Sequence, residues 1–186
     1  MVLILVSSNI GRATTVKTLD LPDLVQQAEI IADVVVTSVQ PYWASPSGGN
    51  AIRTKVTFSL NRPALKGQVN PQFSLDFLGG AVGNRKMVVP GMPQFAVGQR
   101  LILFSYGPNN AYASPIIGFN QGAIRVIRDE QNNVERVYRW WGQPINASQP
   151  FNSPAIGTSV TLSPDQFRSA DTVDQFLQRI TQLVNH

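Results

Sequence analysis

The chain has 186 residues, 43% of them hydrophobic, and a formal net charge of +4, which suits a single domain with a sizeable core. It contains no cysteine, and this excludes disulfides, thiolate nucleophiles and cysteine-ligated metal sites. The 14 glycines and 13 prolines favour many turns and short strands over long helices.

An apolar run opens the chain at Val2–Val6, and small and polar residues follow it up to Ala13. This pattern resembles the end of a secretory signal peptide that lacks its basic beginning. We therefore expect residues 1–13 to be a truncated signal segment and the protein to be periplasmic or secreted; the alternative is a first β-strand. No run reaches the roughly 18 apolar residues that a membrane-spanning helix needs, so we expect no transmembrane segment.

The next elements are predicted to be one short helix and three strands. Leu19–Glu29 begins with Asp20 as a helix cap and carries its apolar residues on one face. Ile30–Gln40 is rich in β-branched residues, which favours a long strand. Ala51–Asn61 and Gln72–Phe77 alternate apolar with polar residues, so each is predicted to be a strand with one buried face.

A stretch rich in glycine and proline, Leu78–Phe104, follows these strands. Its loop Gly79–Gly83 lacks the lysine and hydroxyl residue of a phosphate-binding loop, so we interpret the loop as structural. We expect the stretch to be a shaped connection that leads into an apolar central strand at Arg100–Tyr106. Further strands are predicted at Tyr112–Gly118, Gly122–Arg128 and Val134–Trp140.

The C-terminal part is predicted to be irregular and then helical. Gly142–Thr161 contains three prolines among polar residues, which is typical of a surface loop or linker. Ser163 caps a last helix, which we expect to break near Ser169–Asp171. The predicted fold is therefore mainly β: a small antiparallel OB-like barrel over residues 14–141, with a short N-terminal helix, and a C-terminal segment 142–186 whose helix packs on the barrel.

Two sets of residues resemble known proteins. Ala32–Val36 (ADVVV) and the later turn Ala64–Gly67 (ALKG) resemble the start of netrin-like and tissue-inhibitor-of-metalloproteinase-like domains. The pattern of glycines, prolines and apolar residues from Gly79 to Phe104 resembles a group of uncharacterised bacterial exported proteins. The resemblance implies an OB-fold domain. The animal inhibitors chelate the protease zinc through an N-terminal cysteine, which this chain lacks, so their mechanism is not carried over.

Residues for acid–base catalysis are scarce. His186 is the only histidine, at the end of the chain, and Asp76 is the only carboxylate between Val34 and Arg128. We therefore expect neither a serine–histidine pair nor a histidine-based metal site, and a pair of catalytic carboxylates inside the barrel is excluded. We expect no catalytic residue, no metal and no cofactor, and a protein that is not an enzyme.

Positive charge is concentrated in the predicted barrel. Between Val34 and Arg128, nine basic residues accompany one acidic residue. Arg53, Lys55 and Arg125 lie on predicted strands, where they could form a basic face for an acidic glycan or a nucleic acid. The alternative is a solvated basic surface without a specific ligand.

Aromatic residues beside arginine form the second candidate binding surface, Tyr138–Trp141. Strand alternation should expose some of these rings, and exposed rings beside Arg139 would suit stacking on a sugar or a base. The alternative is that Trp140 or Trp141 covers the barrel end beneath the loop 142–161.

Taken together, the sequence predicts a non-enzymatic exported domain that binds an unknown ligand, with an unknown protein or an anionic glycan as partner. Polyanion binding through the basic face is the alternative, with nucleic acid as the less favoured polyanion. A protease-inhibitor-like module and a hydrolase rank below both. The candidate ligand-binding residues are Arg53, Lys55, Arg125, Arg139, Trp140 and Trp141.

Overall fold

The structure, a computed structural model, describes residues 18–44, 51–108, 112–147 and 163–185. The predicted signal segment, residues 1–13, lies outside these residues, as does most of the irregular segment predicted between residues 142 and 161. The described helices are α1 (Leu21–Gln27), α2 (Pro164–Arg168) and α3 (Val173–Val184). The described strands are β1 (Ile30–Ala44), β2 (Ala51–Leu60), β3 (Gln72–Leu78), β4 (Gly80–Val82), β5 (Arg85–Met87), β6 (Arg100–Ser105), β7 (Ala123–Asp129) and β8 (Val134–Tyr138). The predicted class, mainly β with a short N-terminal helix and a C-terminal helix, is confirmed.

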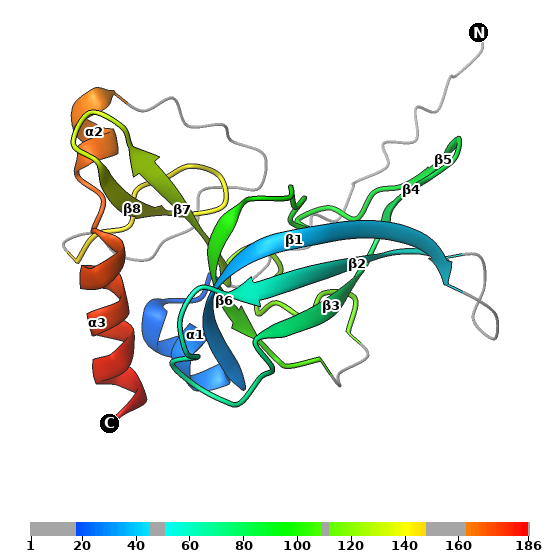
Figure 1. The fold of residues 1–186 in the computed structure, drawn as a ribbon, viewed down its shortest axis with the longest axis horizontal. Helices are drawn as coiled ribbons and strands as arrows, with labels where there is room; N and C mark the ends of the chain where they lie inside the picture. The colour runs from blue at the N-terminus through cyan, green and yellow to red at the C-terminus, as the bar shows by residue number, and fades with distance from the viewer. Residues whose placement is uncertain (1–17, 45–50, 109–111, 148–162, 186) are drawn as a thin grey trace, which may run out of the picture.

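Six strands form one antiparallel sheet in the order β3-β2-β1-β6-β7-β8, and β4 and β5 form a separate hairpin. β1 is the long, curved strand across the middle of Figure 1. It pairs with β6 over Ile30–Val35 and with β2 over Val34–Ala44, with a β-bulge between Val36 and Ser38. The apolar strand predicted before Tyr106 is thus β6, at the centre of the sheet. Closure of this sheet into an OB-like barrel stays a prediction.

The two faces of the sheet carry two separate cores, because successive side chains of a strand point to opposite sides. Ile31 belongs to the helix-side core, where α1 and α3 cover the sheet. Its neighbours Ala32, Val34 and Val36 belong to the inner core on the other face. Figure 1 shows α1 and α3 together at the end of the sheet away from the hairpin β4–β5. The inner core also contains Val56, Phe58, Leu75, Phe77, Leu101, Leu103, Ile116 and Ala123.

Local signals placed all three helices correctly. Asp20 caps α1 by accepting a 2.7 Å hydrogen bond from the backbone N–H of Asp23. The predicted break in the C-terminal helix is confirmed, because α2 ends at Arg168 and Thr172 caps α3. The apolar face of α3, which includes Phe176, is buried against α1 and β8.

The prediction of a strand at Tyr112–Gly118 is wrong. Of its described residues only Ile116 forms a bridge, to Ser105. Pro115 has no N–H to donate to a ladder, and the chain turns sharply at Gly118 and Phe119, where φ is 59° and 60°. This segment therefore runs as a loop beside the end of β6, where the Tyr106 N–H donates to the Pro115 carbonyl at 2.9 Å, and it buries Ile116 in the inner core and Ile117 in the helix-side core.

The glycine-rich loop contains a hairpin that was not predicted. β4 and β5 pair through Gly80 with Met87 and Val82 with Arg85. Gly83 takes the first position of the two-residue turn with a φ of 58°, a backbone conformation that glycine adopts without strain. In Figure 1 the hairpin projects from the end of the sheet farthest from α3.

Candidate functional site

Close contacts fix the hairpin β4–β5 to the strands β1 and β2. The Gly79 N–H donates to the Ile52 carbonyl at 2.8 Å, and the Thr54 hydroxyl donates to the Gly79 carbonyl at 2.7 Å. A Cβ atom on Gly80 would lie 2.4 Å from the Thr54 hydroxyl oxygen and 3.2 Å from Pro41 Cβ. Only glycine allows this approach, because real Cβ atoms are not found so close to other heavy atoms.

The segment after the hairpin returns along the inner face of the sheet and is anchored by Phe95. This ring lies 4.9 Å from the ring of Phe77, 5.7 Å from that of Phe58 and 5.6 Å from that of Trp140. The segment then rejoins β1, since the Gly98 N–H donates to the Val36 carbonyl at 2.8 Å. The glycine-rich stretch is therefore held at both ends and at its middle.

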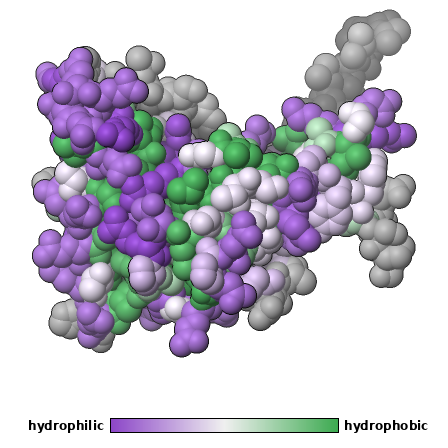
Figure 2. All heavy atoms as spheres, in the orientation of Figure 1, coloured by the Kyte–Doolittle hydropathy of each residue, from purple (hydrophilic) through white to green (hydrophobic). Residues whose placement is uncertain are grey.

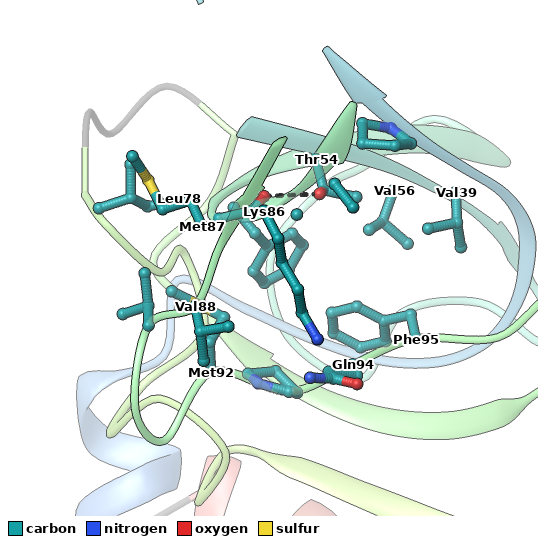
Figure 3. Close-up of a pocket in the computed structure, with 17 residues that line it drawn as sticks. Val39, Thr54, Val56, Leu78, Lys86, Met87, Val88, Met92, Gln94 and Phe95 are labelled. Carbon is teal, nitrogen blue, oxygen red and sulfur yellow. Dashed lines mark hydrogen bonds between the residues drawn. The ribbon is translucent and has the colours of Figure 1, made fainter. Parts of the chain in front are cut away.

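Between the hairpin, this segment and the sheet lies a partly open pocket of about 280 Å³. Its volume is just under the ~300 Å³ at which small-molecule sites commonly begin. Figure 3 shows the lining side chains converging from β1, β2, the hairpin and the segment around Phe95. The lining residues are Val39, Pro41, Thr54, Val56, Phe77, Leu78, Gly79, Gly80, Ala81, Lys86, Met87, Val88, Val89, Met92, Pro93, Gln94 and Phe95.

The pocket is apolar apart from three side chains. The Thr54 hydroxyl is already bonded to the Gly79 carbonyl, which leaves Lys86 and Gln94 as the polar side chains able to meet a ligand. No carboxylate lines the pocket, and none of the ion pairs within the described residues involves Lys86. The pocket can therefore take apolar groups and one negative charge.

Sequence reasoning missed this pocket. It assigned the glycine-rich stretch to a connection, which it is, without recognising that the same stretch forms one wall of a cavity. The available signal was the series of apolar residues Val88, Val89, Met92 and Phe95 within the turns. Here Met92 and Phe95 pack against the inner core, whereas Val88 is 63% exposed.

Arg53 and Lys55 lie on the outer face of β2, around Asp76 of β3. The Arg53 guanidinium donates to the backbone carbonyls of Asp76 and Tyr112 at 3.0 and 3.3 Å. Lys55 is exposed and is the cross-strand neighbour of Asp76. The Tyr42 hydroxyl donates to the Asp76 carboxylate at 2.9 Å, and the pKa of Tyr42 is raised, first by burial and then by this bond.

The other four candidate residues lie on the far half of the sheet. Arg125 is half-buried on β7, beside Tyr138. Arg139 is only 2% exposed, its guanidinium lies 5.5 Å from the centre of the Trp141 ring, and burial lowers its pKa to about 9. The Trp141 indole N–H donates to the Gln143 side chain at 3.4 Å, and Trp140 contacts Phe95.

The candidate residues thus do not form one surface, because β1 and β6 separate β2 from β7 in the sheet. The expectation of exposed rings at Tyr138–Trp141 was wrong: Tyr138 is buried and both tryptophans are half-buried. The exposed rings are those of Tyr42, Trp43 and Tyr112 among the described residues.

Several of the basic residues between Val34 and Arg128 make contacts inside the fold. Arg62 and Arg100 both bind Asp33, a wholly buried carboxylate on β1. Arg100 also contacts Glu135, and its pKa is raised chiefly by the hydrogen bonds to Asp33. The Lys66 ammonium donates to the Val25 carbonyl at the end of α1 at 2.8 Å. Part of the excess positive charge therefore belongs to side chains that make contacts within the fold.

Comparisons of the chain with protein-family models, with curated proteins and with solved structures find no match. Among the described residues, no group of three or more histidine, cysteine, aspartate or glutamate side chains could hold a metal ion. No helix in this part of the chain has the length and apolar character to cross a membrane. The function is therefore argued from the pocket and its residues.

Proposed function

We propose that the protein is a non-enzymatic binding module whose ligand site is the pocket between the hairpin β4–β5 and the inner face of the sheet. The observation that carries the proposal is the composition of the pocket, which combines an apolar wall with a single cation, Lys86. Binding sites for small molecules commonly pair an apolar lining with a few polar groups that orient the ligand.

The lining also supports a binding role over catalysis. General acid–base chemistry needs a group that can exchange a proton near neutral pH, placed beside the reacting atom. Lys86 is the one ionisable side chain in the pocket, and neither a carboxylate nor an imidazole accompanies it. Nucleophilic catalysis would need such a partner to activate the attacking group.

Polyanion binding by the basic residues is less favoured in this proposal than ligand binding in the pocket. The guanidinium of Arg53 is directed to two backbone carbonyls, and Arg139 is buried beside Trp141. Lys55 remains as the exposed cation of the candidate set, and Asp76 lies across the strand from it. Export of the module remains part of the proposal and depends on residues 1–13.

A neutral hydrophobic probe, N-phenyl-1-naphthylamine, tests the proposed site. We expect its fluorescence to rise on binding to the wild-type protein. Val39→Phe should weaken this binding at least tenfold, because the added ring fills the pocket. Val97→Phe is the matched control, since Val97 lies outside the pocket and is 66% exposed; it should leave binding unchanged.

A second variant guards against a folding defect in the first. Ala81 lines the pocket from the exposed side of the hairpin, so Ala81→Phe blocks the pocket without altering the sheet. Circular dichroism establishes that each variant is folded. Equal probe binding by the wild type, folded Val39→Phe and Ala81→Phe would refute the proposed site.

A further inference from the structure

The single charge in the pocket lies at its mouth. Figure 3 shows the Lys86 side chain extending from the hairpin across the opening toward Gln94 and Phe95. An ammonium group offers three hydrogen-bond donors, and a side-chain amide offers two more. The mouth therefore presents donors with one positive charge, and no carboxylate is among the residues that line the pocket.

The floor of the pocket, by contrast, is part of the inner core. Val56 and Phe77 are buried there, and Val39, Met92 and Phe95 pack against the same core. Methionine has three flexible bonds, which lets Met92 adapt to the shape of an apolar ligand. A ligand that uses both regions needs an apolar tail for the floor and an anionic head for Lys86.

The volume limits the length of the tail. The cavity of about 280 Å³ holds roughly nine heavy atoms, when each is given the ~30 Å³ that a water molecule occupies. A chain of about eight carbons fits this space, and a much longer chain would extend into solvent. A carboxylate also matches the donors, because its two oxygens can meet the Lys86 ammonium and the Gln94 amide together.

We propose that the pocket binds a medium-chain fatty carboxylate, with its head on Lys86 and its tail on the inner core. This inference rests on the proposed function, since it names the ligand class of the same site. Hydrogen bonds to a charged group add stabilisation of the order of a tenfold change in affinity when the site is partly desolvated.

Displacement of N-phenyl-1-naphthylamine by three eight-carbon compounds tests the proposal. We expect octanoate to displace the probe at a concentration at least tenfold lower than 1-octanol, and octylammonium to be the weakest competitor. Lys86→Gln should abolish the difference between octanoate and octanol, whereas Lys86→Arg should retain it. Lys55→Gln, which removes an exposed lysine from the opposite face of β2, is the control and should bind like the wild type.

The outcomes separate this inference from the proposed function. If octanol competes as well as octanoate, the carboxylate assignment is wrong while the pocket remains a binding site. If the probe itself does not bind, the proposed function fails first. A short peptide with a C-terminal leucine and a free carboxylate offers the same chemistry. If it competes tenfold better than octanoate, a peptide terminus replaces the fatty acid as the ligand.

Discussion

The guanidinium of Arg100 donates two hydrogen bonds to the carboxylate of Asp33, from Nε to Oδ1 at 2.9 Å and from Nη2 to Oδ2 at 2.7 Å. Asp33 has no exposed surface, and its Oδ2 also lies 2.9 Å from Nε of Arg62. Through Asp33, the central strand β1 is thereby tied to β6 and to the turn that follows β2.

Asp33→Asn should lower the free energy of unfolding by about 3 kcal/mol, because it leaves two arginines without their buried counter-charge. Urea denaturation followed by circular dichroism measures the change. The matched control is Asp174→Asn, whose carboxylate lies 3.5 Å from Arg62 but is 88% exposed; exposed pairs contribute little. Equal effects of the two substitutions would contradict the assigned role of Asp33.

Gly80→Ala should detach the hairpin β4–β5 from the sheet. The new methyl group would collide with the Thr54 hydroxyl, and φ at Gly80 is 135°, a region that residues with a Cβ avoid at a cost of about 1–3 kcal/mol. Gly83→Ala is the control: its φ of 58° is also strained for alanine, but nothing lies within 4 Å of the added carbon, so it isolates the effect of the collision. We expect Gly80→Ala to lower the melting temperature more than Gly83→Ala and to reduce probe binding, whereas the control keeps its binding.

Phe95→Ala should open the pocket and destabilise the fold by about 2 kcal/mol or more, since loss of a packed aromatic ring leaves a cavity. Trp140 would lose its edge contact with Phe95, so the tryptophan emission should shift to longer wavelength. Val97→Ala, two residues along and exposed, should change neither stability nor emission. An unchanged spectrum in Phe95→Ala would show that the ring does not anchor this segment.

Because Tyr138 is buried, we expect the protein to lose stability at high pH. Burial raises the pKa of Tyr138 to about 12 from the ordinary tyrosine value of 10.0, and its hydroxyl donates to the Phe167 carbonyl at 2.7 Å. Between pH 10 and 12 the unfolded chain loses the phenolic proton while the folded chain keeps it, so the free energy of unfolding falls as the pH rises. Below pH 10 this contribution is fully present.

Unfolding measured at pH 9, 10, 11 and 12 tests this contribution. Tyr138→Phe should flatten the decline between pH 10 and 12 and cost about 1 kcal/mol at pH 8 through the lost hydrogen bond. Tyr112→Phe alters an exposed ring and should leave the alkaline decline in place. If the free energy of unfolding declines as much in Tyr138→Phe as in the wild type, the decline arises from another group.

The parts of the fold that were predicted correctly depend on short-range patterns. Alternation in Ala51–Leu60 placed the strand β2, and the capping residues Asp20 and Ser163 placed helix starts, because each signal spans only a few residues. The break between α2 and α3 was likewise visible in the local pattern. These features depend little on what the rest of the chain does.

The features that sequence reasoning missed depend on residues far apart in the chain. Asp33 and Arg100 are 67 positions apart, and an aspartate within an apolar strand gives no indication of its partner. The pocket requires Val39, Phe77 and Phe95 to meet, which follows from the sheet order and not from any one segment. Arg139 has the charge of a surface residue, but its place beside Trp141 is decided by tertiary packing.

The β-bulge between Val36 and Ser38 divides β1 into two halves with different constraints. The first half, Ile30–Val35, pairs with β6 along its length and with β2 at Val34 and Val35, and it supplies side chains to both cores. The second half is paired with β2 alone and supplies Val39 and Pro41 to the pocket. Substitutions at Val39 or Pro41 would therefore change the shape of the proposed ligand pocket without replacing the residues of β1 that pair with β6.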